Sequence, residues 1–217
     1  MIQLTPPQEP PIWLEPFLVH CHTKSYDKNV DFIRQGQAAE TLYYLLEGSV
    51  AALIDDEKEQ RELLLTYINK GEFIGEMGLF IPQSTRSVII RTRTQCKVAE
   101  ITYQRLERLL NNELKSVAKD FLYSIGLQLS IRLRTTSRKV GDLAFLDVTN
   151  RIMGTLFDLC KQPDAMTHPE GMQIRVTRQE LGRIVGCSRE MAGRVLKTLE
   201  QQGFVNVKGK TIVVFNN

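Results

Sequence analysis

The sequence predicts an α+β fold in three parts: an N-terminal antiparallel β-roll, one long helix, and a C-terminal domain of short helices that ends in a hairpin. Three observations predict it. Short apolar runs separated by turn residues fill residues 18–101, as in antiparallel strands. Residues 114–139 contain no proline and a single glycine, so a long helix can form there. Residues 177–215 then give two capped helical segments and two short apolar runs.

The net charge of +3 is unevenly distributed along the chain. Residues 1–146 carry 18 Lys+Arg and 18 Asp+Glu, and therefore no net charge. Residues 147–217 carry 10 Lys+Arg and 7 Asp+Glu, and therefore the whole excess. The total is too small to indicate nucleic-acid binding by itself, whereas its distribution singles out the C-terminal part as the basic one.

The cysteines and the start of the chain bear on its compartment. The four cysteines are widely spaced and none forms a C-x-x-C pair, which favours free thiols in a reducing environment. We find no basic and apolar leader, and no apolar run near the roughly 18 residues of a membrane helix. We therefore expect a cytoplasmic protein without membrane contact. Pro6, Pro7, Pro10 and Pro11 predict an irregular N-terminal arm over residues 1–17.

The β-roll is predicted to span residues 18–113. Its apolar runs are short and evenly spaced, and turn residues lie between them. Gly36, Gly48 and Gly71 suit the tight corners, because glycine adopts backbone angles that other residues avoid.

One loop of the β-roll has the composition of an anion site. Gly75 and Gly78 bracket Glu76 and permit a short turn whose backbone N–H groups can approach a phosphate. Arg86 offers two parallel donors to a phosphate, and Ser87 adds a hydroxyl. The carboxylate of Glu76 could accept from sugar hydroxyls. The alternative is that glycines and an arginine in β-turns are only structural.

The long helix and a hinge are predicted over residues 114–142. Apolar residues alternate at spacings of four and three, which is typical of the seam of a two-stranded coiled coil. The predicted seam residues are Ala118, Leu122, Ile125 and Leu129. The next two seam positions, Arg132 and Thr136, are polar, so either an anion meets them or the seam ends in solvent. Gly141-Asp142 is predicted to break the helix.

The C-terminal domain, residues 143–217, contains the pattern of a helix-turn-helix. Thr177 and Glu180 form a capping box at the start of the first helix. Gly186 provides the turn, and Ser188 caps the second helix. Two helices of this size joined by a tight turn are the arrangement with which many proteins read DNA.

Further elements complete this domain. A helix is predicted at residues 151–160 and a strand at 174–176. Two short apolar runs within residues 204–215 flank Lys208-Gly209-Lys210, which predicts a two-stranded wing. The C-terminal domain is therefore predicted to be a winged helix-turn-helix.

The exposed face of the second helix suggests base recognition. Arg189 and Arg194 can each donate two hydrogen bonds to a guanine, and Glu190 can accept from cytosine N4. The alternative is an ordinary solvated face, but cap, turn, wing and basic charge coincide here. The residues predicted to contact phosphates, which position the protein without specifying sequence, are Arg178, Gln179, Ser188, Thr149, Lys208 and Lys210.

The motifs of both domains together resemble a known family. They are Gly75–Phe80 with Arg86 and Ser87, Val140–Thr149, and Cys187–Glu190. They are similar to the cyclic-AMP receptor protein family, within the catabolite activator and fumarate–nitrate regulator superfamily. The similarity covers nearly everything after the N-terminal arm. It implies a cyclic-nucleotide-binding β-roll, a dimerisation helix, and a winged helix-turn-helix that binds double-stranded DNA.

The resemblance also implies a ligand: one cyclic AMP per subunit inside the β-roll. Gly75 and Glu76 would hold the ribose 2′-hydroxyl, and Arg86 and Ser87 the cyclic phosphate. A carboxylate directly after Arg86 would repel the phosphate, and the residue there is Ser87, which favours cyclic AMP.

The long helix would complete this site in a homodimer. By resemblance, Arg132 reaches toward the ligand and Glu76, while Thr136 and the partner's Ser137 meet the adenine. The ligand would thus satisfy the polar end of the seam and set the two recognition helices on a palindrome of TGTGA-like half-sites. The rival hypothesis is a regulator of the same fold that answers another ligand, such as cyclic di-GMP, or needs none.

The remaining expectations concern partners and chemistry. By resemblance, the loop with Thr167, His168 and Gly171 contacts the C-terminal domain of the RNA polymerase α-subunit. We find no metal-ligand cluster and no pairing of a nucleophile with a base in the sequence. We therefore expect a transcription regulator and not an enzyme.

Overall fold

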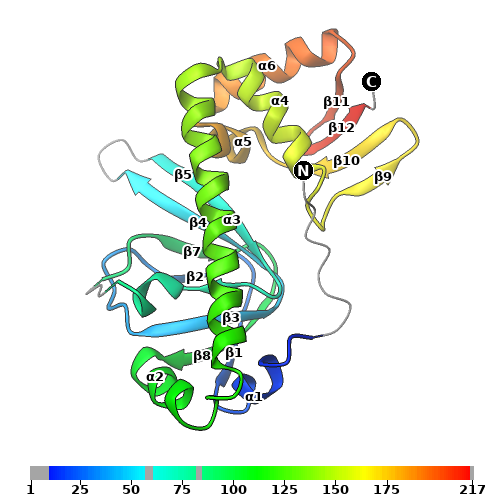
Figure 1. The fold of residues 1–217 in the computed structure, drawn as a ribbon. Coiled ribbons are helices and arrows are strands. Elements are labelled where there is room, and N and C mark those ends of the chain that lie inside the picture. Colours follow the sequence, from blue (N-terminus) through cyan, green and yellow to red (C-terminus); the bar gives the residue numbers. More distant parts are fainter. Residues whose placement is uncertain (1–9, 57–60, 82–84, 216–217) are drawn as a thin grey trace. The chain divides into compact units, whose positions relative to one another are not determined.

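The computed structural model describes residues 10–56, 61–81 and 85–215, and the chain divides into two compact units (Figure 1). The first unit comprises Met1–Ile54 and Thr66–Arg134, and the second comprises Asp55–Leu65 and Thr135–Asn217. Strand β5 and helix α3 each run from one unit into the other.

The first unit is a β-roll built from two four-stranded sheets, with strand orders β1-β8-β3-β6 and β2-β7-β4-β5. Its strands are β1 (His22–Tyr26), β2 (Asp31–Ile33), β3 (Thr41–Glu47), β4 (Ser49–Asp56), β5 (Arg61–Asn69), β6 (Phe73–Ile74), β7 (Ile89–Thr92) and β8 (Cys96–Thr102). Its helices are α1 (Leu14–Leu18), the 3-10 turn η1 (Glu76–Leu79), α2 (Tyr103–Asn111) and the first part of α3 (Ala118–Phe145). The antiparallel β-roll predicted from the sequence is confirmed.

Aromatic side chains from four elements form the core of the first unit. Trp13 and Phe17 of the N-terminal segment pack with Tyr44, Phe73 and Phe121, with ring centroids 5.0–6.4 Å apart. The Trp13 indole N–H also donates to Ser124 Oγ at 2.8 Å. The prediction of an irregular arm over residues 1–17 is therefore wrong for its last five residues, while residues 1–9 lie outside the described part. The prolines predict irregular structure, whereas Trp13 and Phe17, which follow them, belong to the core.

The face of α3 that meets this core differs from the predicted seam. Phe121 and Ile125 are fully buried in the aromatic core, and Leu129 packs against it. The seam position assigned to Ile125 is therefore wrong, because burial inside one chain produces the same periodicity as burial between two chains. The seam positions of Ala118, Leu122 and the partly buried Leu129 stay predictions. The exposed apolar residues include Tyr123 and Leu133, whose side chains are 73% and 70% exposed.

Helix α3 is shifted relative to the prediction, because it begins at Ala118 and not at residue 114. It continues through Gly141 to Phe145, so the predicted break at Gly141-Asp142 is wrong. One glycine in a helix of this length destabilises it by only about 1 kcal/mol, which a long hydrogen-bonded helix tolerates.

The second unit holds three helices on a four-stranded sheet of order β11-β12-β10-β9. Its elements are the end of α3, α4 (Val148–Leu159), β9 (Met166–His168), β10 (Gly171–Arg175), α5 (Arg178–Val185), α6 (Arg189–Gln201), β11 (Val205–Lys208) and β12 (Thr211–Phe215). Ile152, Leu156, Leu181 and Leu196 are fully buried between the helices. The predicted two-stranded wing is part of a larger sheet, because β12 pairs with β10 as well as with β11.

The first part of β5, as far as Leu65, belongs to the second unit. There the Lys139 ammonium donates to the backbone oxygen of Leu65 at 2.6 Å, and burial lowers the pKa of Lys139. Arg183 of α5 forms an ion pair with Glu62 at 3.0 Å. This part of β5 therefore contacts both α3 and the first helix of the helix-turn-helix.

Candidate functional site

The first candidate site is the loop that follows β6. Gly75 has a φ of +82°, and a Cβ added there would lie 2.5 Å from Arg86 Nη1. A Cβ at Gly78 would lie 2.5–2.6 Å from the phenol ring of Tyr103. Both glycines therefore allow close packing of the loop against neighbouring side chains. The amide of Gly78 donates to the Gly75 oxygen at 3.2 Å, so this amide is already engaged within the loop.

Arg86 is a buried cation with neutral partners. Its side chain donates to the Thr41 backbone oxygen at 2.5 Å and to the Tyr103 hydroxyl at 3.0 Å, and only 9% of the residue is exposed. The Tyr103 hydroxyl donates in turn to the Gly75 oxygen at 2.6 Å, and burial raises the pKa of Tyr103. Across the described residues, no carboxylate pairs with Arg86. A buried guanidinium without an anionic partner favours the arrival of an anion.

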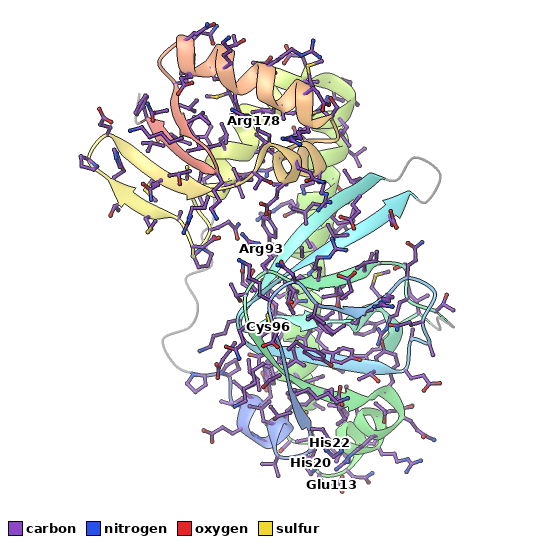
Figure 2. All side chains as sticks on the ribbon, turned by 180° about the vertical axis from the view of Figure 1, so that it is seen from behind. His20, His22, Arg93, Cys96, Glu113 and Arg178 are labelled. Carbon is purple, nitrogen blue, oxygen red and sulfur yellow. The ribbon has the colours of Figure 1, made fainter. Side chains whose placement is uncertain are left out.

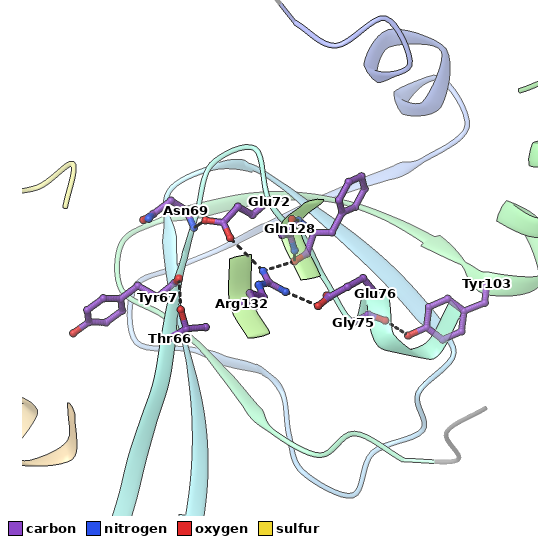
Figure 3. A network of polar contacts seen from close by, with 10 residues as sticks. Thr66, Tyr67, Asn69, Glu72, Gly75, Glu76, Tyr103, Gln128 and Arg132 are labelled. Atoms are coloured by element: carbon purple, nitrogen blue, oxygen red, sulfur yellow. Dashed lines mark hydrogen bonds and ion pairs between the residues drawn. The ribbon is translucent and has the colours of Figure 1, made fainter. Parts of the chain in front are cut away.

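Arg132 has a different environment, because its own chain supplies carboxylates (Figure 3). Its Nη1 donates to Glu76 Oε1 at 2.6 Å, and its Nη2 lies 3.3 Å from Glu72 Oε2. The Nη2 group also donates to the Phe73 oxygen at 2.8 Å. The contact with Glu76 that the resemblance implied is therefore present. Contact of Arg132 with a ligand at a dimer seam stays a prediction.

Gln128 extends this network by one turn of α3. Its side-chain oxygen accepts from the Phe73 N–H at 2.8 Å, and its amide nitrogen donates to the Phe73 oxygen at 2.9 Å (Figure 3). Gln128 and Arg132 together fasten α3 to β6 and to the loop with Glu76. Within the described part of the chain, Arg132 Nε is buried without a hydrogen-bond acceptor.

The other predicted ligand residues are exposed. Ser87 lies next to Arg86 on the surface of the first unit. Thr136 and Ser137 are exposed in the part of α3 that belongs to the second unit. Their contacts with a ligand or a partner subunit stay predictions.

The second candidate site is the helix-turn-helix, whose helix ends are fixed by local hydrogen bonds. Thr177 Oγ1 accepts from the Glu180 N–H at 3.1 Å at the start of α5, as predicted. Gly186 ends α5 with a φ of +70°. Ser188 Oγ accepts from the Met191 N–H at 3.1 Å at the start of α6. A Cβ at Gly182 would lie 2.7 Å from the Cys187 oxygen, so this glycine permits the tight turn.

The predicted base-contacting residues share the exposed face of α6. Ala192, Val195, Leu196 and Leu199 are buried on the opposite face; Arg189, Glu190 and Arg194 are exposed. The pKa of Glu190 is lowered by hydrogen bonds from its own backbone N–H and from the Ser188 hydroxyl, so it remains an ionised acceptor. The side chains of Arg189 and Arg194 form no hydrogen bond or ion pair with any described residue, so their donors are available to a partner.

The predicted phosphate contacts lie on several elements of the second unit. Arg178 and Gln179 are exposed in the first turn of α5, and Figure 2 shows Arg178 in this unit. Lys208 and Lys210 are exposed at the hairpin between β11 and β12. Thr149 is half-buried in the first turn of α4, which Asp147 caps by accepting from the Asn150 N–H at 2.8 Å.

The predicted polymerase-contacting residues lie on the β9–β10 hairpin. Thr167 is exposed and His168 is half-buried, with Nδ1 accepting from the Glu170 N–H at 3.2 Å. Gly171 is buried, and a Cβ there would lie 2.0 Å from the Val214 oxygen. Gly171 is therefore a packing residue of the sheet, which argues against our prediction that it contacts a partner.

Sequence reasoning missed four residues of the first site: Glu72, Gln128, Thr41 and Tyr103. Glu72 and Gln128 each precede a predicted site residue by four positions, which places Gln128 on the Arg132 face of α3. Thr41 and Tyr103 meet Arg86 through a backbone oxygen and a hydroxyl from distant strand and helix ends, for which the sequence offers no signal.

The described residues contain neither a metal-binding cluster nor a membrane-spanning helix. In residues 10–56, 61–81 and 85–215, no group of three His, Cys, Asp or Glu side chains could hold a metal ion, including the region of His20 and His22 (Figure 2). Of the described helices, none combines the length and the apolar composition needed to cross a bilayer.

Comparison with known proteins matches the two regions that contain the candidate sites. A family model described as the cyclic nucleotide-binding domain matches residues 23–113, and one described as bacterial regulatory proteins, crp family, matches residues 174–205. The CRP-like protein Clp of Xanthomonas euvesicatoria pv. vesicatoria is 55% identical over 93% of this chain and 87% of its own length. Clp of Xanthomonas campestris pv. campestris matches to the same extent.

Solved structures agree on the fold. The c-di-GMP-responsive global regulator CLP of Xanthomonas campestris superposes with a TM-score of 0.90 and 54% identity, over 94% of this chain and 99% of that one. A CRP/FNR-family transcriptional regulator from Thermus thermophilus gives a TM-score of 0.74 at 22% identity, over 90% of this chain and 94% of that one. The second likeness concerns the fold alone.

These findings correct the predicted ligand. A relative with more than half its residues identical responds to cyclic di-GMP, which overturns our prediction of cyclic AMP as the cofactor. The preference for cyclic AMP depended on Ser87, a single side chain beside the phosphate site. One position does not determine which nucleotide binds.

Proposed function

The chain belongs to the CRP family of bacterial transcription regulators, and we propose that it binds specific DNA sites as a homodimer under the control of cyclic di-GMP. The observation that carries the DNA-binding part is the exposed face of α6. There the side chains of Arg189 and Arg194, with no hydrogen bond or ion pair to a described residue, lie on the same helix as the ionised Glu190, and Ser188 caps that helix. Such a face matches the donor and acceptor pattern of G·C pairs in the major groove.

The exposed side of α3 supports a homodimer. Tyr123, Gly126, Ser130 and Leu133 follow each other at spacings of three, four and three and are all exposed. This series of positions continues at Ser137. Its small members, Gly126, Ser130 and Ser137, would allow two helices to approach closely. A dimer with two-fold symmetry would place its recognition helices on half-sites one DNA turn, about 34 Å, apart. The half-sites we expect resemble TGTGA.

The ligand proposal rests on the relative that responds to cyclic di-GMP and on the environment of Arg86. That guanidinium has neutral partners and is nearly buried, so a phosphate would supply the missing counter-charge. A ligand shifts an equilibrium only by its differential affinity for the two states. Cyclic di-GMP would therefore have to bind the DNA-binding conformation and the other conformation with different affinities.

A regulator that needs no ligand is the second candidate. The contacts of Arg132 with Glu72 and Glu76 favour it, because they fasten α3 to the β-roll without any added molecule. The two candidates make opposite predictions about the effect of the nucleotide.

The test measures binding to a labelled duplex with two TGTGA half-sites, with and without cyclic di-GMP, and with a scrambled duplex and GMP as controls. We expect a preference for the palindrome and a change in affinity of about 5- to 150-fold on adding cyclic di-GMP, the usual range of allosteric coupling. Unchanged affinity would favour the ligand-independent candidate. Equal binding to both duplexes would refute sequence-specific recognition.

We also infer a contact between the β9–β10 hairpin and RNA polymerase. The support is the exposure of Thr167 and Met166 on a strand at the edge of its sheet. Thr167→Ala should lower transcription from an activated promoter while DNA affinity stays unchanged. Equal transcription by the variant and the wild type would rule out this contact.

A further inference from the structure

We propose that Gly193 is a positioning residue that lets Arg178 of α5 lie across the recognition helix and contact a DNA phosphate. The proposal rests on the proposed DNA-binding function and adds to it a residue with no side chain of its own. It starts from an unexplained glycine. Gly193 lies inside α6, and its φ is not in the left-handed region, so the backbone conformation does not require glycine.

A glycine at such a position weakens the helix, because glycine loses more conformational freedom than alanine when the helix forms. The rest of α6 favours helix formation, with a capped start and four buried apolar side chains. The other glycines of the helix-turn-helix, Gly182 and Gly186, are explained by the turn, where one is in close contact and the other has positive φ. Gly193 therefore needs a different explanation.

The explanation is the side chain of Arg178. A Cβ built on Gly193 would lie 3.2 Å from Arg178 Cδ and 3.5 Å from Arg178 Nε. The aliphatic stem of Arg178 thus rests directly on the backbone of α6. With alanine at this position the stem would have to move by a few tenths of an ångström.

Gly193 lies on the same face of α6 as the predicted base-contacting residues. Gly193 follows Arg189 by four residues and Glu190 by three, so it lies beside them on the exposed face. The side chain of Arg178 is exposed and has no hydrogen bond or ion pair to any residue that the structure describes. Packing against Gly193 is therefore what holds its guanidinium next to the base-contacting side chains, where a phosphate of the same half-site would pass.

The test is a double-mutant cycle of Gly193→Ala and Arg178→Ala on the full-length protein, measured with the palindromic duplex at several salt concentrations. We expect Gly193→Ala to weaken binding about 3- to 10-fold and to reduce the slope of log K against log salt by up to about one, as for a lost phosphate contact. Arg178→Ala should weaken binding at least as much. The double variant should bind DNA with the same affinity as Arg178→Ala, because the side chain that Gly193→Ala displaces is absent there.

Gly154→Ala is the matched control. Gly154 also lies inside an exposed helix face, in α4, and a Cβ there would meet nothing within 4 Å. Both alanines should raise the thermal midpoint slightly through helix propensity, but only Gly193→Ala should weaken DNA binding. Wild-type affinity in Gly193→Ala would overturn the proposal. So would an equal loss of affinity in the Arg178→Ala background, which would indicate that the methyl group blocks DNA directly.

A second measurement separates the positioning from the proposed function. In the free protein labelled with ¹⁵N-arginine, the Nε–H resonance missing from Arg178→Ala identifies Arg178. It should shift in Gly193→Ala and stay in place in Gly154→Ala. If the resonance shifts but neither the wild type nor any variant prefers the palindrome, the proposed function is refuted. The packing of Arg178 against Gly193 would still be supported. An unshifted resonance refutes the packing itself.

Discussion

The arginines of the two units have opposite environments. In the first unit, Arg132 is largely buried and pairs with Glu76 and Glu72 of its own chain. In the second unit, the side chains of Arg189 and Arg194 are exposed on α6 without a hydrogen bond or ion pair to another described residue. The same residue type therefore serves the fold in one place and remains available to an external partner in the other.

This difference determines what a substitution should change. Removing a buried arginine leaves carboxylates or carbonyl groups without their partner, which lowers the stability of the folded state. Removing an exposed arginine leaves nothing unsatisfied, so only binding should respond. Four predictions test this division, beginning with the largest expected effect.

Arg132→Ala should lower the free energy of unfolding by about 3–5 kcal/mol, because it leaves Glu76 buried without a counter-charge. The Glu76 side chain is 6% exposed and makes a 2.6 Å contact with Arg132. Urea denaturation followed by circular dichroism measures the change. Arg134→Ala, on an exposed position of the same helix, is the control and should change stability by less than about 0.5 kcal/mol. Similar small losses in both variants would show that Arg132 is not a structural residue.

Arg189→Ala should weaken binding by about 1–3 kcal/mol through one base pair of the half-site and leave stability unchanged. Binding is measured on duplexes that carry each single substitution in the half-site, and the variant should lose its discrimination at one position. Lys208→Ala is the control, since loss of a phosphate contact should weaken binding to all duplexes alike. A uniform loss in Arg189→Ala would place Arg189 on the phosphates and not on a base.

Ser188→Ala should lower the free energy of unfolding by about 1 kcal/mol, since Ser188 caps the recognition helix. The loss of its hydroxyl also removes a hydrogen bond to Glu190. Thermal or urea unfolding measures the effect, and Ser188→Asn should retain most of the stability because asparagine is an equally good cap. An alanine variant as stable as the wild type would mean that the cap contributes nothing here.

Glu62→Gln should have the smallest effect, about 0–1 kcal/mol of stability at low salt and less at high salt. Its partner Arg183 is intermediate between the two groups, with side chains 35% exposed for Arg183 and 16% for Glu62 at a separation of 3.0 Å. Unfolding at two ionic strengths measures the difference. A larger loss of stability that persists at high salt would show that Arg183 behaves like a buried arginine.

The helix-turn-helix was predictable because its signals are local. Thr177 and Ser188 each act within three residues of their own position, and the caps occur where the sequence places them. The seam of α3 was not predictable in this way. Whether Ile125 faces its own β-roll or a second chain depends on Trp13 and Phe17, which are more than a hundred residues away in sequence.

The first site shows the same limit. The pairing of Arg132 with Glu76 followed from a resemblance, but the second carboxylate and the contacts of Arg86 come from elements brought together only by folding. The nature of the ligand depends on the sum of such contacts. For this reason the single residue Ser87 gave the wrong answer about the nucleotide.

The chain contains one tryptophan, and it lies 3% exposed in the aromatic core of the first unit. Intrinsic tryptophan fluorescence therefore comes from a single, known position. Emission from Trp13 will report loss of the contact between α1 and α3, whose Ser124 accepts its indole N–H. Unfolding of the first unit can thus be followed without an added dye, while helix content measures the whole chain.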